Sequence, residues 1–196
     1  MIGVYAKNRG GVWFGVACDE QRIFGTSFAA SEQGAVRSLL EGMPFGVPFQ
    51  TFSKPSAFAE SILANVKNVY DGKDVSQAFP LSTEHLSAYT RRVLEATSLI
   101  PVGYVASYGS VAKAAGGSPR AVGNVMAANP FAPIVPCHRV VSSDFSLGGY
   151  GGGLDVKHAF LVREKRGYKS QREIPVGSKK LMVFPVEFVL KKLKKH

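Results

Sequence analysis

The sequence predicts a two-domain α/β protein, with a strand-rich first part and a mainly helical second part. Short β-rich apolar runs fill the start of the chain, helical apolar spacing dominates after residue 81, and the net positive charge lies in the second half. At 196 residues with 45% hydrophobic content, the chain can form two small cores. We expect domains at 1–80 and 81–167, followed by a basic extension at 168–196.

The first part is predicted to form three strands followed by two helices. Residues 2–7, 12–18 and 22–28 are short apolar runs that polar or glycine-containing turns separate. Ser31 is placed to cap a helix that ends near Gly42, and helical spacing returns between residues 56 and 70.

The second part is predicted to be mainly helical. Ser82 is expected to cap a helix that ends before Pro101. Residues 107–115 and 119–128 then form two short helices around a Gly-Gly-Ser turn, with Pro119 at a first helical position. These dimensions are typical of a helix-turn-helix, although helical hairpins also occur in proteins that do not bind DNA.

Beyond these helices, irregular chain leads to a last helix. Asn129-Pro130 ends the second short helix, and an extended run is expected before Pro136-Cys137. The glycine-rich residues 148–153 form a loop that lets backbone approach a ligand closely. Asp155 is expected to cap the last helix, and Gly167 to stop it.

The charge distribution indicates a polyanionic partner for the second half. Residues 1–80 carry seven Lys or Arg and seven Asp or Glu, residues 81–167 carry nine and five, and residues 168–196 carry eight and two. The resulting 0, +4 and +6 favour nucleic acid as the partner, with a merely solvated basic surface as the alternative. Residues 185–196 can form a helix with apolar and lysine faces, and we expect an accessory DNA contact or a docking element there.

Localisation and cysteine use point to an intracellular protein without a metal. No apolar run is long enough to span a membrane, and the start resembles no signal peptide, so we expect a soluble, cytoplasmic protein, or a nuclear one in a eukaryote. Cys18 and Cys137 form neither a disulfide framework nor a metal ligand set. Cys18 lies late in a strand and is expected to be an inert buried thiol.

The string Pro136-Cys137-His138-Arg139 is the most informative part of the chain, and apolar residues flank it on both sides. A thiol becomes nucleophilic as thiolate, which cationic or hydrogen-bonding neighbours favour. Burying such polar side chains is costly unless they satisfy one another. The string therefore predicts a site built for cysteine chemistry.

The predicted helix 119–128 has an unusually smooth face. Ala121, Gly123 and Ala127 are small, and Arg120 is a long cation near the helix start. A major-groove reader would present polar side chains to base edges. A small-residue face instead suits the DNA backbone and minor groove, or else tight packing against another helix.

Together these motifs resemble the O6-alkylguanine-DNA alkyltransferases, also called methylated-DNA–protein-cysteine methyltransferases. The resemblance covers residues 82–167 in detail, and the first part fits the family's ribonuclease-H-like α/β domain in outline. It implies a mainly helical winged helix-turn-helix alkyltransferase domain after that domain. The motifs that carry it are Ser107-Tyr108-Gly109, Arg120-Ala121-Val122-Gly123, Asn129-Pro130, Ile134-Val135-Pro136-Cys137-His138-Arg139-Val140-Val141, Gly149-Tyr150 and Gly152-Gly153-Leu154.

The resemblance implies direct-reversal DNA repair. The alkyl group of O6-alkylguanine in double-stranded DNA would pass irreversibly to Cys137, once per molecule, after the base flips out of the duplex. No cofactor is implied, because the protein itself is the acceptor. Some relatives hold an N-terminal zinc, but no histidine precedes His85 here, so we expect none. A monomer is expected, and cooperative binding to DNA and activity on O4-alkylthymine stay open.

The resemblance also implies a role for each site residue. Cys137 would attack the alkyl carbon, His138 would take the thiol proton through a water, and Glu164 would orient His138. Tyr108 would donate a proton or hydrogen bond to the leaving guanine, and Asn129 would tie the helix-turn-helix to the cysteine loop. DNA contacts are implied for Tyr108, Arg120 (which would fill the gap left by the flipped base), Ala121, Gly123, Asn124 and Arg139, and pocket walls for Met126, Val140, Tyr150, Gly151 and Gly152.

Other functional classes fit parts of the pattern. A winged-helix regulator with an electrophile-sensing cysteine would show reversible modification and sequence-specific binding, which the smooth helix 119–128 disfavours. A cysteine hydrolase with a Cys–His–acid triad would turn over on an ester or amide. A lesion-binding protein without transfer activity would lack the cysteine.

The turn between the two short helices is slightly shorter than in many relatives, so Arg120 is not fixed at the family's position by the sequence.

Overall fold

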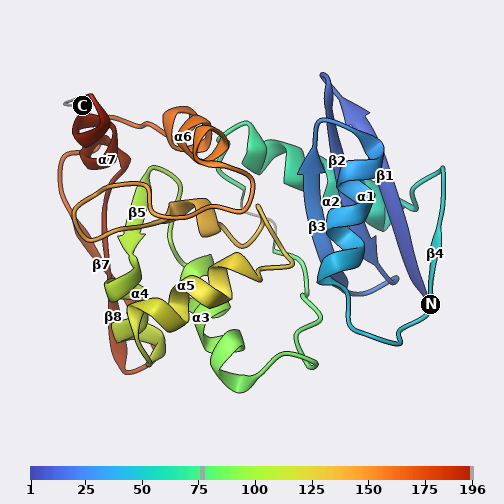
Figure 1. The fold of residues 1–196 in the computed structure, drawn as a ribbon, viewed down its shortest axis with the longest axis horizontal. Coiled ribbons are helices and arrows are strands. Elements are labelled where there is room, and N and C mark those ends of the chain that lie inside the picture. The colour runs from blue at the N-terminus through green and yellow to red at the C-terminus, as the bar shows by residue number, and fades with distance from the viewer. Residues whose placement is uncertain (76–77, 195–196) are drawn as a thin grey trace. The chain divides into compact units, whose positions relative to one another are not determined.

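The computed structural model describes residues 1–75 and 78–194, which fall into two compact units (Figure 1). Unit 1 comprises Met1–Tyr70, Val75–Leu86 and Pro130–Ile134, and unit 2 comprises Asp71–Asp74, Ser87–Asn129 and Val135–His196. Each unit contains a four-stranded sheet.

The sheet of unit 1 has the order β3-β2-β1-β4. Strands β1 (Ile2–Arg9), β2 (Val12–Cys18) and β3 (Ile23–Ala29) form an antiparallel meander, which confirms the three predicted strands. Strand β4 (Phe49–Thr51) pairs parallel with β1 and was not predicted, because a run of three residues is too short to show the alternation of a strand.

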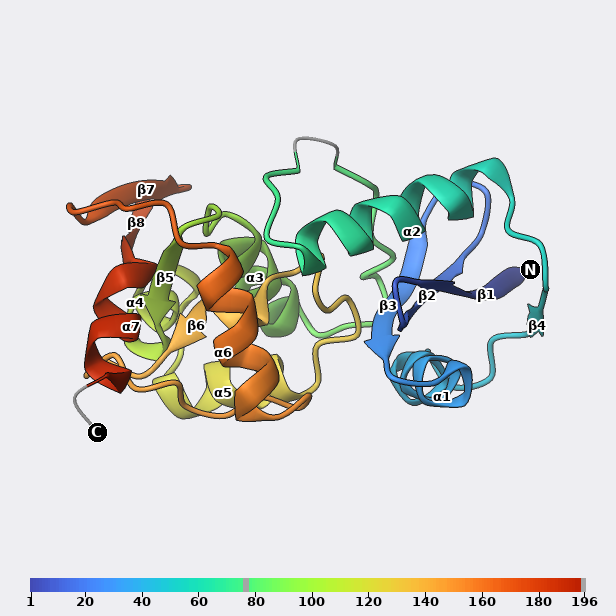
Figure 2. The ribbon, with the colours of Figure 1, turned by 90° about the horizontal axis from the view of Figure 1, so that it is seen from above.

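Two helices cover opposite faces of this sheet (Figure 2). Both α1 (Glu32–Gly42) and α2 (Ala57–Tyr70) confirm the prediction, and Ser31 caps α1 by accepting a hydrogen bond from the Gly34 N–H at 3.1 Å. Cys18 lies in the core between them at 2% exposure, and its pKa is raised to about 12 by burial and by Asp19. Its burial confirms the prediction, and a thiol with so high a pKa is protonated at neutral pH.

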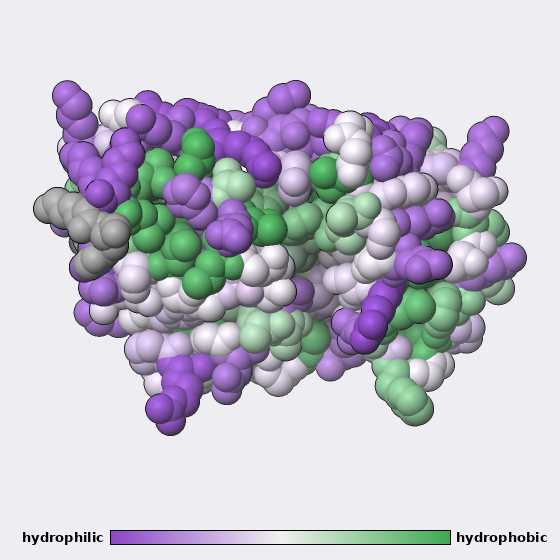
Figure 3. Space-filling model, turned by 45° about the horizontal axis from the view of Figure 1, so that its top comes forward, coloured by the Kyte–Doolittle hydropathy of each residue, from purple (hydrophilic) through white to green (hydrophobic). Residues whose placement is uncertain are grey.

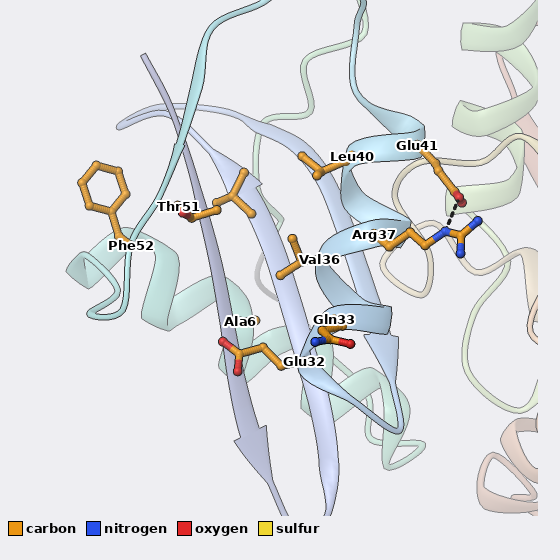
Figure 4. Close-up of a pocket in the computed structure, with 10 residues that line it drawn as sticks. Ala6, Glu32, Gln33, Val36, Arg37, Leu40, Glu41, Thr51 and Phe52 are labelled. Carbon is orange, nitrogen blue, oxygen red and sulfur yellow. Dashed lines mark hydrogen bonds and ion pairs between the residues drawn. The ribbon is translucent and has the colours of Figure 1, made fainter.

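A hollow opens in unit 1 between α1 and the strands β1 and β4 (Figure 4). Val36, Leu40 and Phe52 give it an apolar lining, and the Arg37 Nε–Glu41 Oε1 ion pair at 2.9 Å lies at its rim. Its lining includes neither cysteine nor histidine.

Unit 2 begins with the helical hairpin that the sequence predicted. Helix α3 (Ala88–Ser98) leads through β5 (Tyr104–Ser107) into α4 (Tyr108–Ala115) and then α5 (Pro119–Ala127). Serine caps start both short helices: the Ser107 hydroxyl accepts from the Ser110 N–H at 3.0 Å, and the Ser118 hydroxyl from the Ala121 N–H at 3.2 Å.

The predicted start of α3 at Ser82 is wrong. Ser82 is buried, and its N–H donates to the Ile23 carbonyl at 2.7 Å, beside the parallel bridge between Ile23 and Leu81. The N-cap lies five residues later, where the Ser87 hydroxyl accepts from the Thr90 N–H at 3.0 Å, and the helix begins at Ala88. Either serine can cap a helix, and the long-range pairing with Ile23 decided between them.

The cysteine lies in a short 3₁₀ turn, η1 (Cys137–Arg139), which continues into strand β6 (Val140–Val141). Strand β6 pairs parallel with β5, so the end of the turn is fixed to the sheet just before α4. The chain before the turn was expected to be extended, but Pro130–Ile134 form turns and belong to unit 1. There the Pro130 carbonyl accepts from the Thr26 N–H at 2.9 Å.

The last predicted helix exists as α6 (Leu154–Arg163), but both of its predicted ends are corrected. Gly153, not Asp155, is the N-cap, and its φ of 96° explains why a glycine stands there. The helix ends at Arg163 rather than at Gly167.

The basic extension is part of the core of unit 2. Strands β7 (Arg172–Val176) and β8 (Lys179–Pro185) form a hairpin that gives the sheet order β6-β5-β8-β7. Helix α7 (Val186–Leu193) confirms the helix expected from residue 185, although residues 195–196 lie outside the described residues. Val186 and Val189 join the buried cluster of Val105, Val141 and Leu161.

An apolar groove separates α6 from α7, and Figure 3 shows the apolar surface around it. Leu154 and Val162 form one wall and Leu190 and Leu193 the other.

Within residues 1–75 and 78–194, no helix combines the length and hydropathy that crossing a bilayer requires.

Candidate active site

A cavity of about 580 Å³ in unit 2 brings the helix-turn-helix, the cysteine and the glycine loop together. Its volume lies in the range of small-molecule sites and can hold one purine base. The residues that line it are Tyr108 from α4, Pro119, Arg120, Gly123, Met126 and Ala127 from α5, Cys137 from η1, and Gly149, Tyr150 and Gly151 from the loop.

Cys137 lies in the wall of this cavity with only 6% of its surface exposed. Burial raises the pKa of the thiol, whereas the Asn129 amide, the Lys157 cation and the backbone N–H groups of Cys137 and His138 lower it. Burial outweighs these groups, so the thiol is neutral at rest. A base must therefore take its proton before it can act as a nucleophile.

Asn129 links the end of α5 to the cysteine turn. Its Nδ2 donates to the Val135 carbonyl at 2.9 Å, and its amide also hydrogen-bonds the Cys137 sulfur. A movement of α5 would therefore reach the thiol through one side chain.

His138 is the nearest base, and Glu164 fixes its orientation. The His138 Nε2 lies 2.8 Å from Glu164 Oε1, and both side chains are fully buried. An ionised carboxylate only accepts, so Nε2 carries the proton and Nδ1 keeps a free lone pair. Burial lowers the pKa of His138 while Glu164 opposes this, which favours a neutral ring that can accept a proton. Phe160 stacks on the ring at a centroid distance of 4.3 Å.

Glu164 is held as a carboxylate by its two partners. Burial acts to raise its pKa, but His138 and Arg139 outweigh burial and lower it to about 2. Arg139 Nε donates to Oε2 and Nη2 to Oε1, both at 2.9 Å. The carboxylate is thus ionised and fully hydrogen-bonded in the interior.

The expected DNA contact of Arg139 is corrected by this geometry. Arg139 is 8% exposed, and its Nη1 donates to the Ile100 carbonyl at 2.6 Å while its other donors hold Glu164. A guanidinium with these partners is directed into the core and cannot present its donors to phosphates. Arg139 stabilises the base–carboxylate pair instead.

Lys157 is a site residue that the sequence reasoning missed. It lies on α6, is fully buried, and its Nζ donates to the carbonyls of Val140, Leu147 and Gly149 at 2.6, 2.5 and 3.0 Å. Burial lowers its pKa to about 8, although Cys137 acts to raise it. The spacing from Lys157 to Glu164 places both on one helix face, which was the available signal.

Of the seven predicted residues that line the cavity, Tyr108, Arg120 and Met126 carry the longest side chains of the α4–α5 hairpin. Tyr108 is half-buried and donates to the Gly149 carbonyl at 3.4 Å, and burial raises its pKa. Arg120 is exposed at the start of α5, and Met126 is buried in its last turn. All three belong to the cavity lining, so the hairpin itself forms one wall of the site.

Eight predicted residues lie outside the lining, and four of them, Asn129, His138, Arg139 and Glu164, make the contacts given above. Val140 is fully buried, and it acts through its carbonyl, which accepts from Lys157. Gly152 follows the lining residues in an exposed loop, and Ala121 and Asn124 lie on the outer side of α5.

Gly148 offers a test of how the loop positions Tyr108. Its φ is 69°, and a Cβ added there would lie 2.9 Å from Tyr108 Cε2. We expect Gly148→Ala to displace the tyrosine ring and to slow reaction at Cys137 by about tenfold, since misplacing a reacting group is costly. Gly46→Ala is the matched control, because Gly46 also has a positive φ but its added Cβ meets nothing within 4 Å. Equal rates in both variants, measured by alkylation of Cys137, would contradict this role.

The sequence is similar to proteins of known activity. The family model described as "6-O-methylguanine DNA methyltransferase, DNA binding domain" matches residues 88–166. The methylated-DNA–protein-cysteine methyltransferase of Methanothermobacter thermautotrophicus is 38% identical over 129 residues, which cover 64% of this chain and 70% of that protein. Its namesake from Pyrobaculum aerophilum is 58% identical over 65 residues, which cover 33% and 44%.

The fold is similar to solved structures of the same kind. The O6-methylguanine-DNA methyltransferase of Pyrococcus kodakaraensis matches with a TM-score of 0.65 and 32% identity, over 84% of this chain and 99% of that chain. Mycobacterium tuberculosis OGT in complex with DNA matches with a TM-score of 0.65 and 26% identity, over 83% and 92%. The chain therefore belongs to the methylated-DNA–protein-cysteine methyltransferases, a family of DNA-binding repair enzymes.

Proposed function

We propose that this protein repairs O6-alkylguanine in double-stranded DNA by moving the alkyl group to Cys137, once per molecule. The observation that carries the proposal is a buried thiol in the wall of a base-sized cavity, with the His138–Glu164 pair beside it. Because Cys137 is 6% exposed, it cannot reach a base inside the helical stack. The base must flip into the cavity.

In the proposed reaction, the thiol proton leaves through a water to His138 Nδ1, and the sulfur attacks the alkyl carbon. A C–S bond forms as the bond between that carbon and O6 of guanine breaks. The imidazolium that results is stabilised by Glu164, whose oxygen lies 2.8 Å from Nε2. The electron pair of the broken bond leaves with the guanine.

Two cavity residues are suited to the DNA side of this reaction. The Tyr108 hydroxyl, which burial keeps protonated by raising its pKa, donates a proton or hydrogen bond to the leaving guanine. Arg120 is exposed at the start of α5 and fills the gap that the flipped base leaves in the duplex. Gly123 and Ala127 give α5 a smooth face along which the minor groove can approach.

The product explains why each molecule would act once. A thioether carries neither an S–S nor an S–O bond, so the thiol reductants that restore oxidised cysteine do not cleave it.

We also propose that unit 1 is the ribonuclease-H-like domain and unit 2 the winged helix-turn-helix domain. The meander with a parallel fourth strand supports the former, and the α4–α5 hairpin on its sheet supports the latter.

Incubation with a duplex that contains one O6-methylguanine tests the proposal. We expect one methyl group on the Cys137 peptide by mass spectrometry, no modification of Cys137→Ala, and normal transfer by the matched control Cys18→Ala. With the duplex in excess, transfer should stop at one equivalent. Unmodified protein with an intact lesion, continued turnover, or release of the group by a thiol reductant would each contradict the proposal.

A further inference from the structure

The C-terminal hairpin completes the sheet that carries the helix-turn-helix. Strand β5 runs directly into α4, and β8 pairs antiparallel with β5 through Tyr104↔Pro185 and Val105↔Phe184. Strand β7 pairs only with β8, which gives the order β5-β8-β7. In a winged helix, a hairpin that comes after the helix-turn-helix pairs with the strand that precedes it. Here β5 is that strand and β7–β8 is that hairpin, so the hairpin lies where the wing of a winged helix would lie.

The hairpin lies beside α4. Because β8 pairs with β5 only through its last residues, its earlier residues extend past the end of β5 and pack along α4 (Figure 1). Leu181 and Val183 are fully buried on this side. Helix α4 also supplies Tyr108 to the reaction cavity. The hairpin and the cavity are thus attached to the same short helix.

The tip of the hairpin is tight and cationic. The turn Val176-Gly177-Ser178-Lys179 has two central residues, and Gly177 takes a φ of 58° at the first of them. Lys179 and Lys180 follow the turn and are exposed. Lys180 Nζ lies 2.6 Å from Glu173 Oε2, whereas Lys179 forms no ion pair within the part of the chain that the structure describes.

The charge of this segment exceeds what its packing requires. The buried residues of β8 and α7 complete the core, whereas residues 168–196 add eight Lys or Arg against two Asp or Glu beyond the end of the matched family domain. We infer that the β7–β8 hairpin is a wing whose tip lysines, Lys179 and Lys180, bind phosphates of the duplex beside the lesion. This inference rests on the duplex substrate of the proposed function. Phosphate contacts of this kind position a protein on DNA without reading sequence.

The salt dependence of binding to an undamaged duplex tests the wing. The double variant Lys179→Ala/Lys180→Ala should reduce the slope of log K against log salt by about 1.8, since each phosphate contact contributes about 0.9. When the salt concentration rises from 50 to 200 mM, both proteins lose affinity, and the fold-loss of the parent protein should be about twelve times that of the variant. Lys54→Ala/Lys73→Ala removes the same charge from exposed positions outside the hairpin and should leave the slope unchanged.

The possible outcomes distinguish phosphate binding by the hairpin from a general effect of removing positive charge, and from a failure of the proposed repair reaction. Equal slopes in the two double variants, or no change in either, would overturn the inference. Thermal melting checks that the variants fold, and Lys179→Gln/Lys180→Gln repeats the test should the alanine pair fail to fold. Binding to undamaged DNA involves no transfer, so a reduced slope in the hairpin variant supports the wing even if the methyl-transfer assay fails.

Discussion

Glu164→Gln is expected to lower the free energy of unfolding by about 3–5 kcal/mol at pH 7. The carboxylate is fully buried and accepts hydrogen bonds from His138 and Arg139 at 2.8 and 2.9 Å. A neutral amide keeps the shape of the side chain but leaves the Arg139 guanidinium in the interior without its counter-charge. Urea denaturation measures the effect.

The matched control is Glu41→Gln. Glu41 also pairs with an arginine, Arg37, at 2.9 Å, but both side chains are mostly exposed. Exposed ion pairs contribute little, because water screens them, so this variant should unfold almost like the parent protein. Equal losses in the two variants would show that burial of the Glu164 pair has no special effect on stability.

The same carboxylate predicts an acid sensitivity. The pKa of Glu164 is about 2 in the folded protein against an ordinary value of 4.5, so its contribution is complete above pH 4.5 and is lost as the pH falls towards 2. Integrated over this interval, linkage gives about 3 kcal/mol. Unfolding measured between pH 5 and pH 3 should therefore show a steeper loss in the parent protein than in Glu164→Gln. Parallel curves would contradict the assignment.

Local signals account for the parts of the fold that the sequence predicted correctly. Ser31 caps its helix through neighbouring N–H groups, as the sequence indicates. Ser82 offers the same hydroxyl acceptor and misled the prediction, because pairing with Ile23, far away in the chain, holds this segment outside the helix. Strands β7 and β8 were missed for a related reason: Pro175 and the lysines after the turn hide a hairpin that pairing with β5 and packing along α4 stabilise.

In the site, too, features set by neighbouring residues could be predicted, whereas features set by long-range contacts could not. Cys137 and His138 are neighbours in sequence, so their chemistry could be predicted from the string itself. Glu164 required the family resemblance, because 26 residues separate it from His138. Arg139 was misplaced since a cation in a sequence does not reveal which carboxylate it will meet. Lys157 was missed because its partners are backbone carbonyls, although its spacing from Glu164 along one helix face was an available signal.

Lys157→Met is expected to slow methyl transfer to Cys137 by about 100-fold, in line with the loss of one preorganised donor near a developing charge. The Nζ of Lys157 holds the carbonyls of Val140, Leu147 and Gly149 and lies close enough to lower the pKa of the Cys137 thiol. Methionine fills the space but supplies neither donors nor charge. Single-turnover transfer from a methylated duplex measures the rate.

A pH profile separates this electrostatic role from a loss of packing. The pKa of Lys157 is lowered to about 8, so its cation is present below that pH and is lost above it. The transfer rate of the parent protein should therefore fall as the pH rises through about 8, and this descending limb should be absent in Lys157→Met. Lys165→Met is the matched control, because Lys165 is exposed just beyond the end of the same helix and should leave rate and profile unchanged. If Lys157→Met keeps the limb near pH 8, the group that titrates there is not Lys157, and the lysine serves only to hold the loop.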